Sequence, residues 1–326
     1  MLQSGRHRQP ITILLKSASR APSVHNSQPW VVRVTAPERL EVLLNENIAL
    51  LYADPTGRGG WMAIGAFVEN LAVIAEKTGM RASIEFLNNV VTTELEPAEP
   101  TDRSTALGGA MGRRATNRSL FTPLQDVKES TERLGIFKEG GSAAVFIQDS
   151  TRLQKLAELN REGTRAAYKD RGFCGEHADW LRSSFTRKKD GIPGYAIGVP
   201  ALVSLMLPHI IRTKDISAKR ADAEYKKSLS TNLYAVITAG TESPEGWFNA
   251  GRCMQRLMLR ATELGIEQSP NAAPIEMGFA DEVRSLAGTP DHPQLLIRLG
   301  RAEPVRRHTP RKPVEEFTTW ERSSDA

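Results

Sequence analysis

The chain has 326 residues, of which 40% are hydrophobic and 25% are charged. This length and balance are typical of one large globular domain or two ordinary ones, and they exclude a disordered or fibrous chain. Lysine and arginine (43) outnumber aspartate and glutamate (38), an excess that suits an anionic ligand. Because only 6% of residues are aromatic and the basic residues are scattered, we expect no nucleic-acid partner.

Signals for export, membrane insertion and metal binding are weak. Cys174 and Cys253 are the two cysteines and lack CxxC spacing, which indicates reduced thiols in a cytoplasmic protein. The apolar stretches at 11–15 and 202–211 are too short to span a bilayer, so we expect no membrane partner. The six histidines are isolated in sequence, and we predict no metal site.

The first part of the chain alternates helix and strand patterns. We predict a helix over 9–21, a polar loop at 21–29, a hairpin from 30–35 and 40–45, a strongly apolar helix over 61–77 and a strand at 82–87. A polar stretch over 94–112, rich in proline and glycine, is expected to join two halves of the molecule.

The second part repeats the mixture of elements. We predict helices near 124–134, 150–168 and 247–264, and strands at 143–148, 233–239 and 294–299. Residues 170–200 contain five glycines and little periodicity, which is typical of a lid or a binding loop. A basic tail follows at 306–313.

An ungapped internal repeat links the two parts. When 61–80 is aligned with 247–266, five positions are identical: Trp61/Trp247, Gly65/Gly251, Leu71/Leu257, Ala75/Ala261 and Gly79/Gly265. Two unrelated buried helices can share small and apolar residues at such spacings, but we favour a duplication. The two helices would then pair face to face, like a homodimer contained in one chain.

The segment 20–30 is the first candidate for chemistry. Two prolines stiffen a loop that offers Ser23, Asn26 and Gln28 as hydrogen-bonding groups. A rigid polar rim of this kind suits a planar heterocycle with a carbonyl-rich edge. The alternative is a loop whose side chains cap their own backbone, and the residues alone leave both possibilities open.

Two basic segments are candidates for an anion site. Residues 113–118 contain three arginines and Thr116, and guanidinium groups bind phosphate oxygens in forked pairs. The tail at 306–313 could supply another arginine. The alternatives are an exposed basic patch and a disordered basic end.

These segments resemble parts of one flavoprotein family. The sequence Ala-Pro-Ser-Val-His-Asn-Ser-Gln-Pro-Trp at 21–30 resembles the flavin-contacting loop of nitroreductases, and looks most like that of the mycobacterial Acg-like group. Arg114-Ala-Thr-Asn-Arg118 resembles the family's phosphate-binding element, and Arg311-Lys312-Pro313 its C-terminal Arg-x-Pro element. Residues 264–272 are similar to the turn and segment that face the flavin's reactive edge. The resemblance spans residues 10 to about 316 and leaves out much of 160–230.

Each half lacks an element that the other retains. The first half has the flavin loop but no basic motif before it, and Gly140-Gly141-Ser142-Ala143 replaces the loop in the second half. The resemblance therefore implies one site per chain in an α+β, nitroreductase-like fold. Two pseudo-repeats, each a mostly antiparallel sheet flanked by helices, would form an intramolecular pseudo-dimer. We divide them into 1–108, with the flavin loop, and 109–326, with the phosphate motif, the candidate lid 170–200 and a C-terminal arm.

The resemblance implies FMN as the cofactor and flavin-borne chemistry without a catalytic side chain. Arg114, Thr116 and Arg311 would hold the phosphate, and Arg118 would reach the pyrimidine side of the ring. The remaining expected contacts are Pro22, Ser23, Val24 and Asn26 along the ring, and Pro270, Asn271 and Ala272 at its reactive edge.

Two functions follow from the resemblance. In the first, a cytoplasmic monomeric pseudo-dimer takes electrons from NADH or NADPH and passes them to a nitroaromatic, a quinone or a similar small acceptor. In the second, the chain stores or sequesters FMN under stress with little turnover, because a lid covers the flavin. A covered ring excludes nicotinamide, so the position of the lid distinguishes the two functions.

Overall fold

The computed structural model describes residues 4–135 and 137–321. Within these residues, the first half of the chain forms most of a five-stranded sheet, which we call the first sheet. Its order is β12-β1-β2-β4-β3, with β1 (Trp30–Ala36), β2 (Arg39–Leu44), β3 (Met80–Leu87), β4 (Val90–Pro97) and β12 (Thr318–Trp320). All neighbours are antiparallel except β12, which runs parallel to β1. The Val32 N–H donates to the carbonyl of Phe317 at 2.8 Å, so the C-terminal arm completes the first sheet.

The second sheet is built from residues of the other half of the chain. Its order is β10-β11-β9-β6-β5, with β5 (Lys138–Glu139), β6 (Ser142–Ile147), β9 (Leu233–Ala239), β10 (Glu267–Asn271) and β11 (His292–Gly300), and every pairing is antiparallel. Every residue of β9 is buried, which explains its continuous apolar sequence. The predicted α+β class with two mostly antiparallel sheets is confirmed.

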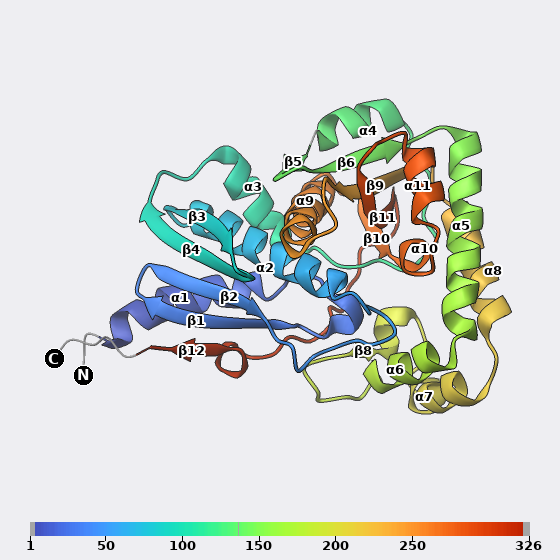
Figure 1. Cartoon of the computed structure of the whole chain (residues 1–326), viewed down its shortest axis with the longest axis horizontal. Coiled ribbons are helices and arrows are strands. Elements are labelled where there is room, and N and C mark those ends of the chain that lie inside the picture. Colours follow the sequence, from blue (N-terminus) through green and yellow to red (C-terminus); the bar gives the residue numbers. More distant parts are fainter. Residues whose placement is uncertain (1–3, 136, 322–326) are drawn as a thin grey trace.

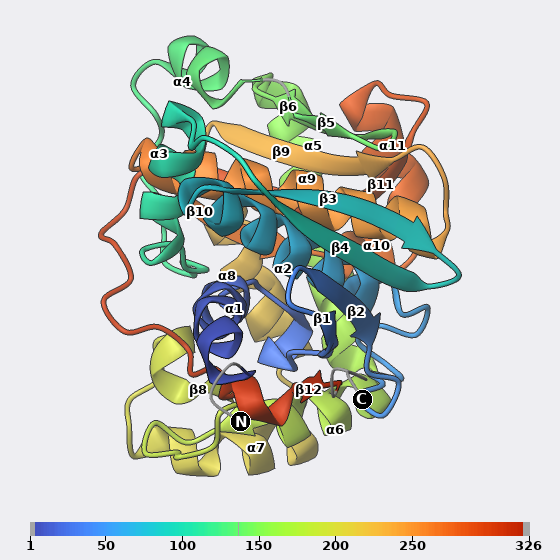
Figure 2. The ribbon, with the colours of Figure 1, turned by 90° about the vertical axis from the view of Figure 1, so that its left-hand side faces the viewer.

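Two long helices pack against each other between the sheets (Figure 1). They are α2 (Arg58–Lys77) and α9 (Pro244–Glu263), and their first residues differ by 244 − 58 = 186 positions, the same shift as in the sequence repeat. Figure 2 shows the two sheets on opposite sides of this helix pair. The chain therefore has the internal pseudo-dimer that the repeat predicts.

The closest approach of the two helices lies at the repeated glycines. A Cβ atom added at Gly65 would overlap the carbonyl oxygen of Phe248, and one added at Gly251 would overlap the carbonyl oxygen of Met62. Gly65 and Gly251 are equivalent under the repeat, and so are Met62 and Phe248. The contact is thus made twice, reciprocally, and it explains why glycine occupies both positions.

A buried ion-pair network crosses the same interface. Glu69 of α2 is 1% exposed and accepts from Arg256 at 2.6 Å and from Arg252 at 3.3 Å, both on α9. The two arginines also pair with Glu139 of β5. A buried carboxylate is stable only with such partners, so the network fixes how the two halves fit together.

The remaining helices surround this centre. In the first half α1 (Ser4–Ala18) packs on α2, and α3 (Asp102–Met111) contacts both α2 and α9. In the second half α4 (Val127–Leu134), α10 (Ala273–Glu276) and α11 (Ala280–Ala287) lie near the sheet. The longest segment between two of its strands forms α5 (Ser150–Lys169), α6 (Arg171–Trp180), α7 (Val203–Thr213) and α8 (Ser217–Ser228), with the short strands β7 (Leu181–Arg182) and β8 (Ile192–Pro193).

Some expected elements differ from the structure. The polar stretch 94–112 contains the end of β4 and the helix α3, which begins with a capping box between Thr101 and Ser104. Residues 170–200 contain α6 despite their weak periodicity. The proposed division at 108/109 falls inside α3, and the C-terminal arm returns to the first sheet; the division itself stays a prediction. Among the described residues, no helix is long and apolar enough to cross a membrane.

We expect Gly65→Ala to destabilise the folded chain by about 3 kcal/mol, because the added methyl group must push α2 and α9 apart. Chemical denaturation of parent and variant measures the difference in the free energy of unfolding.

Gly109→Ala is the matched control. Gly109 also lies within a helix, but a Cβ atom there meets nothing within 4 Å. This change should leave stability unchanged or raise it by about 0.5–1 kcal/mol through helix propensity. Equal effects of the two substitutions would show that the helix contact at Gly65 is not tight.

Candidate functional site

The loop between α1 and β1 holds an unusual backbone conformation. His25, Asn26 and Gln28 have φ angles of 53°, 57° and 55°. Non-glycine residues rarely adopt this left-handed region, and a cluster of them is typical of a functional site whose surroundings hold the strain.

Side chains of this loop reach distant segments as well as their own backbone. The Ser23 hydroxyl accepts from the Gln28 N–H at 3.0 Å, which is the local capping that the sequence left open. Asn26 instead donates to the carbonyls of Gly191 and Pro310, both at 3.1 Å. Gln28 donates to the Lys189 carbonyl at 2.7 Å and accepts from the Lys312 N–H at 2.8 Å. The loop therefore joins residues 189–191 and the C-terminal arm.

A second group of residues consists of Arg20, Arg114 and Arg311, which we call the arginine cluster. Arg114 is 5% exposed and donates from Nη2 to the Arg20 carbonyl at 3.1 Å, whereas its Nε and Nη1 have no partner. Arg311 donates from Nη1 to Asn26 Oδ1 at 2.8 Å and from Nε to the Ser19 carbonyl at 2.7 Å. Residues from both halves thus meet here.

The arginine cluster carries positive charge without a carboxylate. None of the ion pairs in residues 4–135 and 137–321 involves its three members. Burial, followed by the charge of Arg20, lowers the pKa of Arg114 to about 10. Burial, followed by the charges of Arg114 and Arg20, lowers the pKa of Arg311 to about 9.

These features are those of an anion site. Burying a guanidinium with unpartnered N–H groups is costly unless an anion accepts from them. The planar fork of N–H groups matches two oxygens of a phosphate or carboxylate. The residues present therefore fit a phosphate group.

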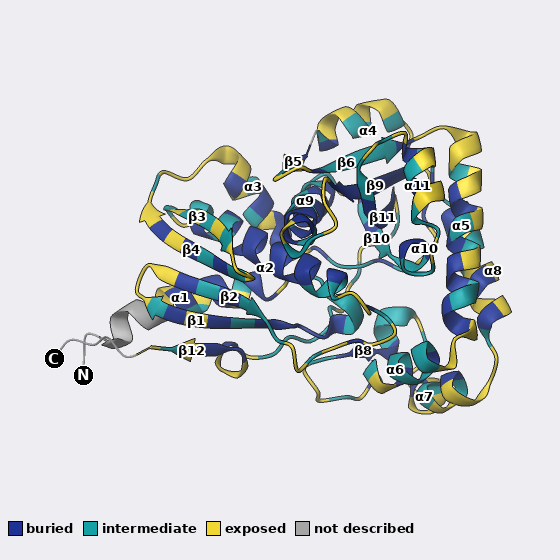
Figure 3. Ribbon diagram, in the orientation of Figure 1, coloured by how far each residue is buried: buried dark blue, intermediate teal, exposed yellow. Residues whose placement is uncertain are grey.

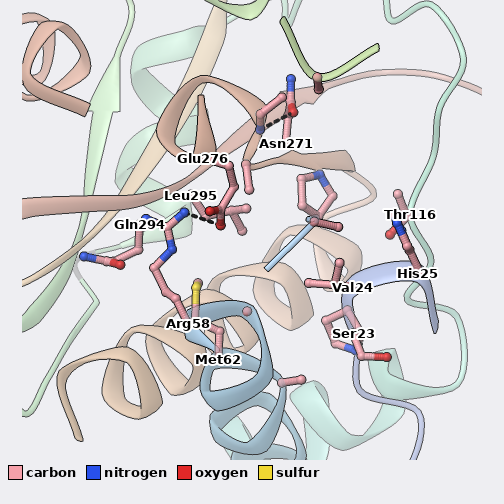
Figure 4. A pocket seen from close by; sticks show the side chains of 18 of the residues that line it. Ser23, Val24, His25, Arg58, Met62, Thr116, Asn271, Glu276, Gln294 and Leu295 are labelled. Atoms are coloured by element: carbon pink, nitrogen blue, oxygen red, sulfur yellow. Dashed lines mark hydrogen bonds and ion pairs between the residues drawn. The ribbon is translucent and has the colours of Figure 1, made fainter. Parts of the chain in front are cut away.

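Two adjoining cavities lie at the loop. The small cavity, of about 80 Å³, is lined by Asn26, Arg114, Arg311 and the tail residues Val305 and Arg307–Thr309. The large cavity, of about 300 Å³, extends between the two halves (Figure 4). That volume is at the lower end of the range for small-molecule sites. Both cavities are lined by Pro22, Ser23, His25, Thr116, Arg118 and Ile192.

The structure brings all the predicted site residues to these cavities. The small cavity has Asn26, Arg114 and Arg311, and the large cavity has Val24, Pro270, Asn271 and Ala272. Pro22, Ser23, Thr116 and Arg118 border both. Their individual contacts with a flavin stay predictions.

An ion pair that the sequence did not predict lines the large cavity. Arg58 at the start of α2 donates to Glu276 of α10, so the pair links the two halves. In Figure 4 the two side chains lie with Gln294 opposite Val24, His25 and Thr116. Burial raises the pKa of the Glu276 carboxyl, and the charge of Arg58 opposes this. Residues 218 positions apart leave no local signal in the sequence.

Tyr168, His177 and His25 form a chain of hydrogen-bonding side chains. The guanidinium of Arg220 lies over the Tyr168 ring, 5.2 Å from its centroid. The Tyr168 hydroxyl lies 3.3 Å from His177 Nε2, and His177 Nδ1 faces His25 Nε2 at 3.4 Å. Burial, followed by the charge of Arg118, lowers the pKa of His25 to about 4. His25 is therefore neutral near pH 7.

The candidate lid 170–200 contacts the loop and borders the large cavity. Phe173 of α6 and Ile192 of β8 line that cavity. The Phe173 ring stacks on His177 with centroids 5.7 Å apart, and the Gly191 N–H donates to the Asn26 carbonyl at 3.4 Å. Sequence reasoning missed Phe173 and His177 because isolated residues carry no spacing signal.

In the part of the chain that the structure describes, no group of three histidine, cysteine, aspartate or glutamate residues could hold a metal ion.

Comparisons with known proteins agree with the motifs. No protein-family model matches the chain. A "Putative NAD(P)H nitroreductase" of Mycobacterium tuberculosis is 24% identical over 336 residues, which cover 96% of this chain and 92% of that protein. The "Putative NAD(P)H nitroreductase acg" of the same organism is 26% identical over 323 residues, 92% of each chain.

Among solved structures, the FMN-dependent nitroreductase NfnB from Mycobacterium smegmatis aligns at 17% identity with a TM-score of 0.43, over 68% of this chain and 100% of its own. The similarity to the curated relatives extends over more than nine-tenths of the chain. Together with the loop and phosphate motifs, it confirms the resemblance of this chain to the nitroreductase-like proteins that include Acg.

Proposed function

We propose that the chain binds one FMN and acts as an oxidoreductase that takes electrons from NADH or NADPH. The observation that carries the proposal is Arg114, a buried guanidinium with two unpartnered nitrogens beside a small cavity. A phosphate there would satisfy those nitrogens, and the adjoining large cavity would take the ring. We infer NADH or NADPH as the reductant because the two relatives are named as NAD(P)H nitroreductases.

Residues from both halves would jointly bind the cofactor. Arg114, Thr116 and Arg311 would bind its phosphate, and the ring would lie between Val24 and residues 270–272. Arg118 would stabilise the negative charge of the reduced ring, which raises its reduction potential. FMN supplies hydride and electron transfer when it is bound, so the protein need only position it and its partners.

The walls of the large cavity favour a flat, apolar electron acceptor. Met62, Met254, Phe173 and Leu295 supply apolar and polarisable surface, and the pair Arg58–Glu276 supplies both a donor and an acceptor. Nitroaromatic compounds and quinones combine an aromatic plane with polar oxygens, and they suit such a lining.

The contacts of the lid favour a second function, FMN storage or sequestration. Gly191 exchanges hydrogen bonds with Asn26 in both directions, and Phe173 borders the cavity where the ring would lie. A lid held in this position would exclude nicotinamide while keeping the flavin bound.

The visible absorption spectrum separates these functions. We expect the purified protein to be yellow or to become so with added FMN, and an oxidoreductase should bleach when NADPH or NADH is added without oxygen. A protein that stays yellow with both nucleotides supports storage. Failure to take up FMN would contradict both.

Arg114→Ala should weaken FMN binding by about 1.5–3 kcal/mol, the contribution of a charged hydrogen bond. Equilibrium titration monitored by flavin fluorescence measures the dissociation constant. Arg113→Ala is the control, because the neighbouring arginine is exposed and lines neither cavity. Unchanged affinity in the Arg114 variant would remove the phosphate assignment.

Acidification should destabilise the folded chain between pH 6.5 and pH 4. His25 has a folded pKa of about 4 against 6.5 when unfolded, so the unfolded chain takes up the proton first. The contribution of His25 to the free energy of unfolding is fully present above pH 6.5. About 2–3 kcal/mol of it should be lost as the pH falls to 4. Denaturation at several pH values measures the slope.

His25→Asn should flatten this dependence on pH. The exposed His209 of α7 provides the control, and His209→Asn should retain the slope of the parent protein. Identical slopes in all three proteins would show that His25 is not held neutral by the fold.

A further inference from the structure

Five large apolar side chains are exposed on α7 and on the turn beside it, and we call them the α7 patch. They are Phe185 (64% exposed), Leu202 (74%), Val203 (46%), Leu205 (56%) and Met206 (56%). The opposite face of α7 is already used, because Leu207 and Ile211 pack with residues of α6 and β7. The α7 patch is therefore not part of a core in this chain.

The members of the α7 patch lie together in space. The Ser184 N–H donates to the Ser204 hydroxyl at 2.8 Å, which fixes the turn carrying Phe185 to the first turn of α7. Figure 3 shows exposed residues along α7 at the lower margin of the molecule, away from the two five-stranded sheets. Scattered exposed apolar residues need no explanation, but a contiguous group of this kind marks an interaction site.

The segment that carries the α7 patch has more basic than acidic residues. Residues 185–214 contain five basic residues and a single acidic one, Asp190. Asp190 pairs with Arg182 at 2.9 Å, and Arg212 pairs with Asp179. The exposed cations Arg187, Lys188, Lys189 and Lys214 take part in none of the ion pairs found in the described residues.

We propose that the α7 patch docks on an anionic lipid bilayer. Its apolar side chains would enter the boundary between headgroups and acyl chains, and the four cations would meet the lipid phosphates. The expectation of no membrane partner rested on the lack of a spanning segment. A helix that lies on the surface needs no such length, since its apolar face enters only the interfacial layer.

Charge and composition argue against other occupants. A second copy of the chain, related by a twofold axis, would place the same cations face to face, which is repulsive. Single-stranded nucleic acid binds through several stacking aromatic rings, and the α7 patch has only Phe185.

The α7 patch is the outer side of the segment whose inner side borders the large cavity. Phe173 and Ile192 line the cavity, and Ile192 also packs in the same cluster as Ile211 of α7. A bilayer on the outer side would therefore lie beside the candidate lid. The docking itself does not depend on the proposed function, because it can be measured without flavin or electron acceptor.

Vesicle flotation of the full chain tests the proposal. Vesicles of phosphatidylcholine alone are compared with vesicles containing about 30% phosphatidylglycerol, at low and high salt. We expect binding to the anionic vesicles that weakens as salt rises, because salt screens surface charges. Binding to neutral vesicles should be far weaker.

Two variants locate the surface. Arg187→Gln, Lys188→Gln and Lys189→Gln together should weaken binding roughly 100-fold, since each basic residue contributes about fivefold. Leu202→Gln with Met206→Gln should weaken it at least about tenfold through lost apolar burial. Leu87→Gln, at the end of β3, is the control, because Leu87 is 60% exposed and belongs to the first half.

Three results would overturn the proposal. The first is a parent protein that does not prefer anionic vesicles. The second is vesicle binding as strong as that of the parent by both the triple variant at 187–189 and the double variant at Leu202 and Met206. The third is self-association, detected by light scattering without vesicles and abolished by the Leu202 and Met206 changes, which would identify a second copy as the occupant. Circular dichroism and thermal unfolding confirm that the variants are folded.

Discussion

The contact between α2 and α9 at Gly65 and Gly251 determines where everything else in the molecule lies. Each glycine faces a backbone carbonyl of the opposite helix, so the helix axes come closer than side chains would allow. Glu69 and its two arginine partners then set the register between the helices. The α1 helix is tied to this pair through Asn70, which donates to the Ala18 carbonyl at 3.2 Å. The strained loop that follows α1 is thereby brought to the second half.

The site that results is shared between the halves, and its electrostatics reflect that division. The first half supplies the loop with His25 and Asn26, and the second half supplies Arg114 and the arm with Arg311. The first half has the polar rim and one cation of the arginine cluster, Arg20, whereas the other two cations belong to the second half. The lowered pKa values of Arg114 and Arg311 mean that their charged forms are less stable in the folded chain than in water. An anion bound there would stabilise the folded state by mass action.

The sequence predicted those helices and strands whose residue pattern has a local physical cause. The helix at 61–77, the strand at 233–239 and the helix repeat follow from burial, which selects apolar residues at regular spacing. The polar composition of 94–112 concealed α3, although its capping box was present, and β12 is too short for any periodicity. The site loop and the arginines stand in compact motifs. The pair Arg58–Glu276 and the chain from Tyr168 to His25 arise only from tertiary packing, which no single segment records.

The parallel strand β12 also bears on how the chain is made. It follows every strand of the second sheet in sequence, yet it covers the edge of β1 in the first. A chain emerging from the ribosome therefore exposes the β1 edge until the whole second half has been translated. Open strand edges recruit other chains, so this interval is when misassembly is most favourable. Because Arg311 precedes β12 on the same arm, closing that edge also delivers the last cation to the site.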